Sequence, residues 1–548
     1  MSNRLATRFT LGALCLACIF VAAFAFQRFW GDSKGMPASQ EGLKNGLNSP
    51  KEVFFNPKEQ GLYYFKKVYS GGELPLFSEY KNQLPKPIFD RNPDYIRFYY
   101  KAWQLGFERY RRPEPGSPFV SNYIDEAFNG NMFLWGSSVS TMWGNYAHQI
   151  FPGIQSLDNF YATQLRNGEI VREISEKTGK LGVEGWSEPG TAGNLNHPML
   201  AWAELESYRI TANKTRLSEV YMPLLKYRES FISIYHEPSG LYLTDKSAMD
   251  DSPRNEELLC GIDVASEVVA FDHWLAQIAT IIGKPNEAKK LSARAESYAT
   301  YINHKLWDED TGFYYDWAKS DERMTMRTVA AFWTMLGKIP GEQQLASLIA
   351  HLNDTASFKT LHRVPTHPVN EKGFGGNYWD GGVWSPINAM VVRGLELNGK
   401  NSLAYDIAMN HLYATAEVFK DTGMIWENYH PLVLRKGVKA RPDYVGWSGI
   451  APIKYLIEYA IGIRINAPQN EISWHVNEMG RHGIEQLRFG ASDGLWNKVS
   501  LIASERTSSD DTLKLSVQCE HPFTLNVLYK SRKHTYEILC DATQVIEI

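Results

Sequence analysis

The sequence predicts a mainly α-helical protein with a small β-sandwich at its C-terminus, from two observations. Between about 90 and 465, apolar residues recur at helical spacing; within 264–283 one stripe comprises Val264, Val268, Phe271, Leu275, Ile278 and Ile282. The same pattern predicts helices over 286–306, 386–398, 401–418 and 449–463. After about 468 the pattern changes to period-two runs such as NKVSLIAS, TLKLSVQ and FTLNVLY, which are typical of strands.

Short strand-like segments between the predicted helices each begin at a glycine. Gly168, Gly240 and Gly312 follow one another at equal intervals, and Gly423 begins a further segment. Such an interval holds two helices and their loops, so the repetition predicts helical hairpins arranged in a ring, an (α/α) toroid. The interval exceeds the usual solenoid repeats, and a globular all-α bundle stays open as the alternative.

The N-terminus has the composition of an export signal. Arg4 and Arg8 precede a long uncharged stretch, 9–26, in which Ala23-Phe24-Ala25 resembles a cleavage site. The stretch is also long enough to remain as one anchoring helix with the rest of the chain outside. We expect an exported protein, periplasmic or associated with the inner membrane, with a signal peptide or anchor (1–30), a linker and N-terminal extension (31–89), a helical domain (90–467) and a β-sandwich (468–548).

Charge and composition narrow the class of partner. Lys+Arg 57 against Asp+Glu 61 gives a net charge of −4, so no nucleic-acid partner is expected. Aromatic residues make up 13% of the chain, and many lie beside glycines and polar residues. They indicate either a large core rimmed by aromatics or a cleft for sugars. Cys519 and Cys540 are a candidate pair in the C-terminal domain, whereas Cys260 stands alone.

In a helical toroid, chemistry is expected on the loops at one end of the ring. Six segments combine polar, aromatic and glycine residues: 128–148, 187–202, SAMDDSPR (247–254), GGNYWDGGVWSP (375–386), MIWENYHP (424–431) and ARPDYVGWSG (440–449). SAMDDSPR sets two adjacent carboxylates beside a proline and an arginine, just beyond the strand-like GLYLTDK.

These segments, in this order, resemble the inverting glycoside hydrolases of the processing α-glucosidase and mannosylglycerate-hydrolase-like family (glycoside hydrolase family 63-like), which is related more distantly to trehalases. SAMDDSPR resembles that family's S-G-M-D-N-S-P-R, NYWDGGVWSPIN resembles Y-W-R-G-P-x-W-x-x-x-N, and WENY resembles E-x-Y/N. The resemblance covers about 120–465. It implies an (α/α)6 toroid (barrel) and an exo-acting hydrolase of α-linked glucosides or mannosides of small saccharides.

The resemblance assigns Asp250 as general acid and Glu427 as general base. Inverting hydrolysis needs one acid to protonate the leaving oxygen and one carboxylate to activate water, roughly 6.5–9.5 Å apart. Burial and the neighbouring Asp251 are expected to raise the pKa of Asp250, against the effect of Arg254. The structural alternatives are an Asx-turn before Pro253 and a surface glutamate at 427.

Ten further residues are predicted to bind substrate. Any of the tryptophans can be a core residue rather than a sugar platform, and His197 can be a helix-start residue rather than a ligand. Arg254 is a candidate for orienting a substrate hydroxyl. The set is Trp135, Asn194, His197, Asp251, Arg254, Tyr378, Trp379, Asp380, Trp384 and Trp426.

Two positions depart from the family's pattern. Phe133-Leu134-Trp135-Gly136 stands where relatives read F-L-W-D, and Asp380 stands where they carry arginine. The missing aspartate is the one that grips hydroxyls of the sugar at the cleavage point. One acid lost and one gained suggests a swap in which Asp380 reaches the region vacated at Gly136. A different sugar, an altered aglycone or a protein that binds glycans without cutting them are the other interpretations.

Three functions therefore stay open, with an exported inverting glycosidase favoured. The second is a noncatalytic glycan-binding protein on the same barrel. The third is a polysaccharide lyase of the (α/α) toroid type, using for example Tyr146 and His148 to abstract a proton. No His/Cys/Asp/Glu cluster has zinc-ligand spacing and no phosphate-binding glycine motif occurs, so neither a metal nor a cofactor is expected.

Overall fold

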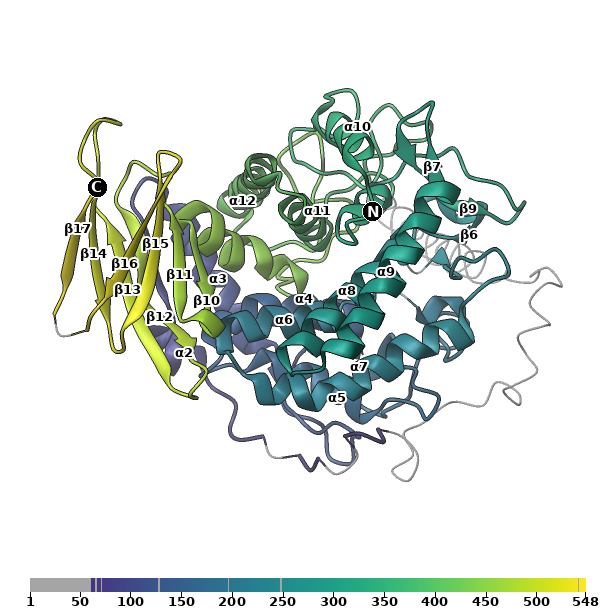
Figure 1. Cartoon of the computed structure of the whole chain (residues 1–548), viewed down its shortest axis with the longest axis horizontal. Coiled ribbons are helices and arrows are strands. Elements are labelled where there is room, and N and C mark those ends of the chain that lie inside the picture. The colour runs from purple at the N-terminus through teal and green to yellow at the C-terminus, as the bar shows by residue number, and fades with distance from the viewer. Residues whose placement is uncertain are drawn as a thin grey trace, which may run out of the picture. The chain divides into compact units, whose positions relative to one another are not determined.

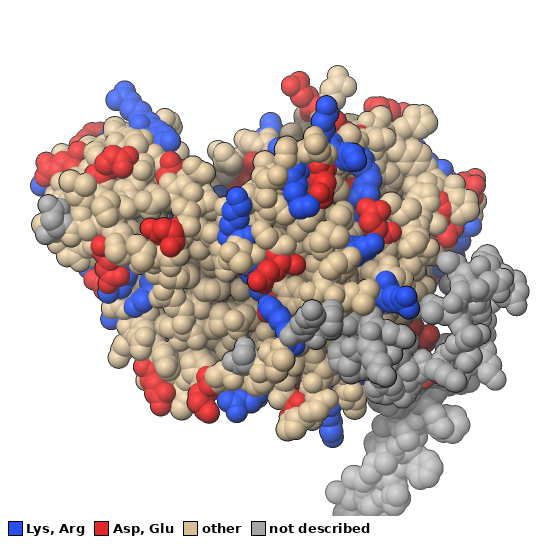
Figure 2. All heavy atoms as spheres, turned by 60° about the horizontal axis from the view of Figure 1, so that its bottom comes forward, with Lys and Arg blue, Asp and Glu red and all other residues tan. Residues whose placement is uncertain are grey.

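The computed structural model describes residues 61–64, 67–69, 71–126, 129–195, 197–246, 249–540 and 542–548 (Figure 1). The predicted signal or anchor segment and most of the predicted linker lie outside these residues. Within them, no helix has both the length and the apolar character needed to cross a bilayer. Figure 2 shows positive and negative side chains interspersed over one face of the molecule.

Helices make up the region from 93 to 461. They are α3 (Pro93–Glu108), α4 (Leu134–Gly144), α5 (Ser156–Ala162), α6 (Leu200–Thr211), α7 (Lys214–Ile234), α8 (Ile262–Ile281), α9 (Pro285–Leu306), η8 (Val329–Met335), α10 (Glu342–Asn353), α11 (Ser385–Leu397), α12 (Asn401–Thr422), η9 (Trp447–Ile450) and η10 (Ala451–Ile461). The five helices predicted from periodicity are therefore all present, within a few residues of their expected ends.

The contacts between helices run in a closed order. α4 contacts α6, α6 contacts α8, α8 contacts η8, η8 contacts α11, α11 contacts η9, and η9 contacts α4 again. Further helices lie against these: α7 and α9 on α8, α12 on α11, and α5 on α4. This arrangement gives six inner elements with outer helices beside them.

An inner position explains the composition of α8. The predicted apolar stripe is buried from Val264 to Ile278, but the other sides of the helix are buried as well. Asp263, Glu267 and Asp272 are among these buried residues. Buried carboxylates need partners, and all three have one: Arg254, His197 and Arg228.

Short two-stranded ladders connect the helices. They pair β2 (Tyr110–Arg111) with β3 (Tyr123–Ile124), β4 (Asn131–Phe133) with β5 (Glu173–Ser175), β6 (Leu258–Cys260) with β9 (Trp317–Ala318), and β7 (Trp307–Asp308) with β8 (Phe313–Tyr314). The four glycines expected to begin the strand-like segments all adopt positive φ, between 62° and 94°. At Gly168 a Cβ would also stand 2.4 Å from the backbone oxygen of Lys226, so only glycine fits there.

The C-terminal region forms two sheets. One has the order β1 (Lys86–Phe89), β12 (His482–Gly490), β13 (Trp496–Ala503), β14 (Lys514–Cys519), β17 (Gln544–Glu547); the other has β10 (Ile463–Asn466), β11 (Glu471–His475), β15 (Phe523–Tyr529), β16 (Arg532–Ile538). Only β11 and β15 are parallel among these pairs. β1 was not expected, because the sequence prediction placed it within the linker.

Side chains from the two sheets meet in a shared core. Phe489 of β12 and Phe523 of β15 have ring centroids 6.1 Å apart, and burial alternates along β13. The indole N–H of Trp474 donates to the carbonyl of Ile461 at 2.9 Å, which fastens the sheets to the end of η10. Cys519 and Cys540 form a disulfide, as the sequence predicted, and Cys260 is buried and free.

We expect the disulfide to stabilise the sandwich by about 3 kcal/mol, since it closes a loop of 21 residues. A thiol reagent added to denatured, unreduced protein should titrate two cysteines fewer than after reduction. Cys519→Ala should lower the unfolding free energy of the C-terminal domain by about that amount. Equal thiol counts before and after reduction would contradict the pairing.

Candidate functional site

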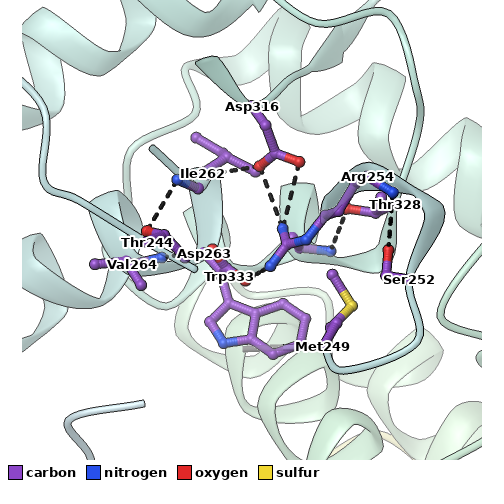
Figure 3. Close-up of polar contacts among 12 residues, drawn as sticks. Thr244, Met249, Ser252, Arg254, Ile262, Asp263, Val264, Asp316, Thr328 and Trp333 are labelled. Atoms are coloured by element: carbon purple, nitrogen blue, oxygen red, sulfur yellow. Dashed lines mark hydrogen bonds and ion pairs between the residues drawn. The ribbon is translucent and has the colours of Figure 1, made fainter. Parts of the chain in front are cut away.

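The loop that carries Asp250 is anchored by Arg254, whose side chain is fully buried (Figure 3). Its Nη2 donates to Asp263 Oδ2 at 2.6 Å, and its Nη1 lies 3.3 Å from both carboxylate oxygens of Asp316. Asp316 also accepts from the backbone N–H of Ile262, at the start of α8. The guanidinium is thus committed to two aspartates, and it holds the loop rather than facing a substrate.

Asp250 lies in this anchored loop, just before the short helix η7 (Pro253–Glu256). Asn255 Nδ2 donates to the carbonyl oxygens of Met249 and Asp250, at 2.7 and 3.0 Å, and fixes the backbone there. Burial raises the pKa of Asp250 to about 7; Arg172 opposes this increase, while Asp251 and Asp245 add to it. A carboxyl with such a pKa retains a proton near neutral pH.

Glu427 is buried and paired with Arg441. Its Oε2 also accepts from the backbone N–H of Arg441 at 3.2 Å, and the indole N–H of Trp447 donates to its backbone oxygen at 2.9 Å. Burial raises the pKa of the Glu427 carboxyl, while the charge and hydrogen bonds of Arg441 lower it. The pairing with Arg441 therefore favours the ionised form that a base requires.

Tyr378 relates the two carboxyl groups in space. Its pKa is raised by burial and then by the charges of both Glu427 and Asp250, and it shares a side-chain hydrogen bond with Arg441. The ion pairs of Asp251 with Lys439 and of Glu427 with Arg441 bring the two segments, which are far apart in sequence, to the same loop.

Aromatic rings gather beside these groups. Trp135 has ring centroids 6.0 Å from Trp379, 5.7 Å from Trp447 and 4.0 Å from His197. Trp384 is completely buried under Trp379, stacked at 3.9 Å, so it supports that ring. Trp135, Trp379 and Trp447 keep 5–9% of their surface exposed.

Other predicted binding residues have partners within the protein. Asn194 bonds to Glu169, Tyr235 and the backbone of Arg172. His197 Nδ1 lies 2.7 Å from Glu267 Oε1, and this fixes its ring beneath Trp135. Both side chains are buried at 1% exposure, so they position the groups that line the site.

Asp251 and Trp426 have other surroundings. Asp251 is exposed and forms an ion pair with Lys439 at 2.9 Å. Trp426 packs in a separate small core with Val383, Val418 and Tyr429.

The two residues considered for lyase chemistry are used elsewhere. The Tyr146 hydroxyl is hydrogen-bonded to Glu458 in a buried charge network. His148 stacks on Trp496 of the C-terminal sheet, at 5.5 Å, and burial lowers its pKa to about 4. The surroundings of both residues therefore give no support to the lyase interpretation.

The region at Gly136 is filled by Glu126 and not by Asp380. A Cβ at position 136 would stand 1.0 Å from Glu126 Oε1, and its three nearest atoms all belong to that carboxyl group. Asp380 instead lies beside Gly375, where a Cβ would stand 2.3 Å from Asp380 Oδ2. The predicted swap, in which Asp380 reaches the region vacated at Gly136, is therefore wrong, and the carboxyl comes from the segment after β3.

Sequence reasoning missed four further residues at this site. Arg441, Tyr444 and Trp447 all belong to ARPDYVGWSG, a segment that was noted without assigning these side chains. Arg172, whose charge lowers the pKa of both Asp250 and Glu126, lies within the strand-like segment NGEIVRE that contains Gly168. Among the described residues, no group of three or more His, Cys, Asp or Glu is arranged to hold a metal ion.

Comparisons with known proteins identify the family of the chain. The family model for the mannosylglycerate hydrolase MGH1-like glycoside hydrolase domain matches residues 155–433, just over half of the chain. The chain is 28% identical over 403 residues to an uncharacterized protein of Borreliella burgdorferi, covering 71% of this chain and 82% of that one. It is 29% identical over 130 residues to a mannosylglycerate hydrolase of Rubrobacter radiotolerans, covering 23% of this chain and 29% of the relative.

The solved structure of a glycoside hydrolase family 63 mannosylglycerate hydrolase from Thermus thermophilus, in complex with glucose, has a similar fold. The TM-score is 0.53 at 15% identity, and the match covers 65% of this chain and 99% of the other. The chain therefore belongs to the mannosylglycerate hydrolase MGH1-like family of glycoside hydrolases.

Proposed function

We propose that this glycoside hydrolase is an exported, exo-acting, inverting enzyme for α-linked glucosides or mannosides of small saccharides, with Asp250 as general acid and Glu427 as general base. The observation that carries the proposal is a half-buried Asp250 and a buried Glu427 on separate loops, which the ion pairs Asp251–Lys439 and Glu427–Arg441 connect to one segment, 439–441. Their unequal surroundings divide the two roles. The anionic Asp251 and Asp245 help to keep Asp250 protonated by raising its pKa, whereas Arg441 favours the ionised form of Glu427.

In this mechanism the Asp250 carboxyl donates its proton to the glycosidic oxygen as the bond from that oxygen to the anomeric carbon breaks. A water molecule attacks the anomeric carbon from the opposite face, and Glu427 takes a proton from that water. The products are a sugar of inverted anomeric configuration and a free alcohol. Asp250 leaves the cycle ionised and Glu427 protonated, and exchange with solvent restores both.

The aromatic cluster supports a sugar as substrate, because the rings of Trp135, Trp379 and Trp447 offer apolar faces next to polar groups. Mannosides and glucosides are chosen from the relatives, one of which is a mannosylglycerate hydrolase and another of which was solved with glucose. Exo action fits small glycosides of this kind.

Two further parts of the proposal concern architecture and location. The closed order of helix contacts and the fold of the Thermus enzyme support an (α/α)6 barrel. The Cys519–Cys540 disulfide supports export, because disulfides persist mainly in oxidising compartments. We propose a periplasmic location, with 1–30 as signal peptide or inner-membrane anchor.

Variants should separate the acid from the base. The first step is a panel of α- and β-linked gluco-, manno- and galacto-disaccharides and glycosylglycerates, to find the substrate. Asp250→Asn should slow its hydrolysis by about 10²–10⁴-fold, since an amide cannot protonate the leaving oxygen. The same variant should keep most of its activity on the matching 2,4-dinitrophenyl glycoside, whose leaving group departs without a proton.

Glu427→Gln should lose activity on both kinds of substrate, because water attack needs the base in each case. Asp251→Asn is the matched control for a carboxylate lost from the same loop, and we expect it to lose less than about tenfold, since Asp251 is exposed and already paired with Lys439. Equal losses for Asp250→Asn on both substrates would contradict its role as the acid.

The pH dependence follows from the two pKa shifts. Asp250 acts in its protonated form, so kcat/KM should fall as pH rises through about 7. Glu427 acts in its ionised form, so kcat/KM should also fall as pH drops through a pKa above the ordinary glutamate value of 4.5. In Asp250→Asn with the dinitrophenyl glycoside, the alkaline limb near 7 should disappear. A limb that persists unchanged in that variant would show that another group is the acid.

A further inference from the structure

The carboxyl group of Glu126 lies over the first turn of α4, in space that no side chain of α4 fills. Gly136 provides that space, since a Cβ at this position would overlap Glu126 Oε1 at 1.0 Å and Cδ at 1.7 Å. Gly446 approaches from another side, where a Cβ would stand 3.3 Å from Glu126 Cγ. Two glycines from distant segments thus make room for the Glu126 side chain, Gly136 at its carboxyl group and Gly446 at its methylene carbons.

Only half of this carboxyl group has a partner. Its Oε2 accepts a hydrogen bond from the Tyr444 hydroxyl at 2.7 Å. Its Oε1 is fully buried and has no hydrogen-bond partner among the described residues. An unmade hydrogen bond at a buried polar atom costs about 1–3 kcal/mol. The structure therefore retains an unsatisfied oxygen where an apolar group would be less costly.

The neighbours of Glu126 place it within the site. The charge of Glu427 raises the pKa of the Glu126 carboxyl and that of Arg172 lowers it. The charges of Glu126 and Glu427 in turn raise the pKa of Tyr444. The Tyr444 ring packs on Trp447 at 4.8 Å, and Trp447 is one of the rings around Trp135. The free oxygen therefore belongs to the same group of side chains as the proposed base.

We propose that Glu126 binds a hydroxyl of the sugar whose bond is cleaved, and that Gly136 is required so that this carboxyl can occupy its position. This inference rests on the proposed function and deepens it, because it names the residue that reads the sugar next to Glu427. Burial raises the pKa of Glu126 to about 8, so below that pH the group is protonated and can donate as well as accept.

The test uses the whole purified protein in the Asp250→Asn background, so that binding is measured without turnover. Tryptophan fluorescence or calorimetry would record the affinity for glucose, for mannose and for their 2-, 3-, 4- and 6-deoxy analogues. Glu126→Ala should weaken binding of the preferred sugar about tenfold, the value of one good hydrogen bond. Glu126→Gln, which is uncharged and of the same size, should lose no more than about threefold.

Gly136→Ala should behave like Glu126→Ala, because its Cβ displaces the carboxyl group. One deoxy sugar should bind equally weakly to the parent and to Glu126→Ala, and this identifies the hydroxyl. The inference is overturned if Glu126→Ala, folded and with unchanged thermal stability, binds every sugar as the parent does. It is also overturned if removal of each sugar hydroxyl weakens binding to Glu126→Ala by the same factor as binding to the parent. The same holds if the deoxy sugar that binds the parent and a variant equally weakly does so with Asp380→Ala and not with Glu126→Ala.

The two proposals fail in distinguishable ways. If the parent binds sugar with the predicted Glu126 dependence but the enzyme with Asp250 intact hydrolyses no glycoside of the panel, the hydrolytic function is wrong and the binding role of Glu126 holds. If hydrolysis occurs and Glu126→Ala leaves KM and the choice of sugar unchanged, only the role of Glu126 is wrong. Both are overturned if the parent binds none of the sugars and the enzyme with Asp250 intact hydrolyses no glycoside of the panel.

Discussion

The ion pairs of Arg254 with Asp263 and Asp316 hold in place the loop that carries Asp250, and this loop supplies one of the two carboxyl groups on which the proposed mechanism depends. All three side chains are almost completely buried. Removing one partner of such a group leaves an uncompensated charge and costs about 3–5 kcal/mol. Asp263 and Asp316 also accept backbone N–H groups at the start of α8, so the loop and the inner helix are held together as one unit.

Burial raises the pKa of three carboxyl groups at the site, and different partners oppose the increase at each. Asp250 and Glu126 have pKa values raised to about 7 and about 8, respectively, because burial outweighs the charge of Arg172 on both. Glu427 is more strongly stabilised as an anion, because Arg441 provides both its guanidinium and its backbone N–H. A site in which one carboxyl group is paired with an arginine and another has a raised pKa can hold a base and an acid together at the same pH.

The sequence was sufficient for whatever depends on local patterns. Periodicity located α8, α9, α11 and α12, period-two runs located the sandwich strands, and the SAMDDSPR and WENY segments located the candidate acid and base. Long-range pairing was missed, because nothing in KPIF marks it as the edge partner of β12. Arg254 was taken for a ligand because a buried arginine and an exposed one look the same in sequence. The third carboxyl group at the site was the hardest to predict. Gly136 indicated that a side chain was missing there, but the carboxyl group that fills the space belongs to Glu126. The hydroxyl of Tyr444, near the end of the helical region, donates a hydrogen bond to it.

The central claim is inverting hydrolysis by two carboxyl groups, and the anomer first released tests it most directly. Proton NMR of the reaction on the identified substrate, recorded before mutarotation, would show the anomeric signal. An inverting mechanism predicts that an α-linked substrate gives the β-anomer first. Initial release of the α-anomer would mean retention, and would contradict a mechanism in which Glu427 activates water.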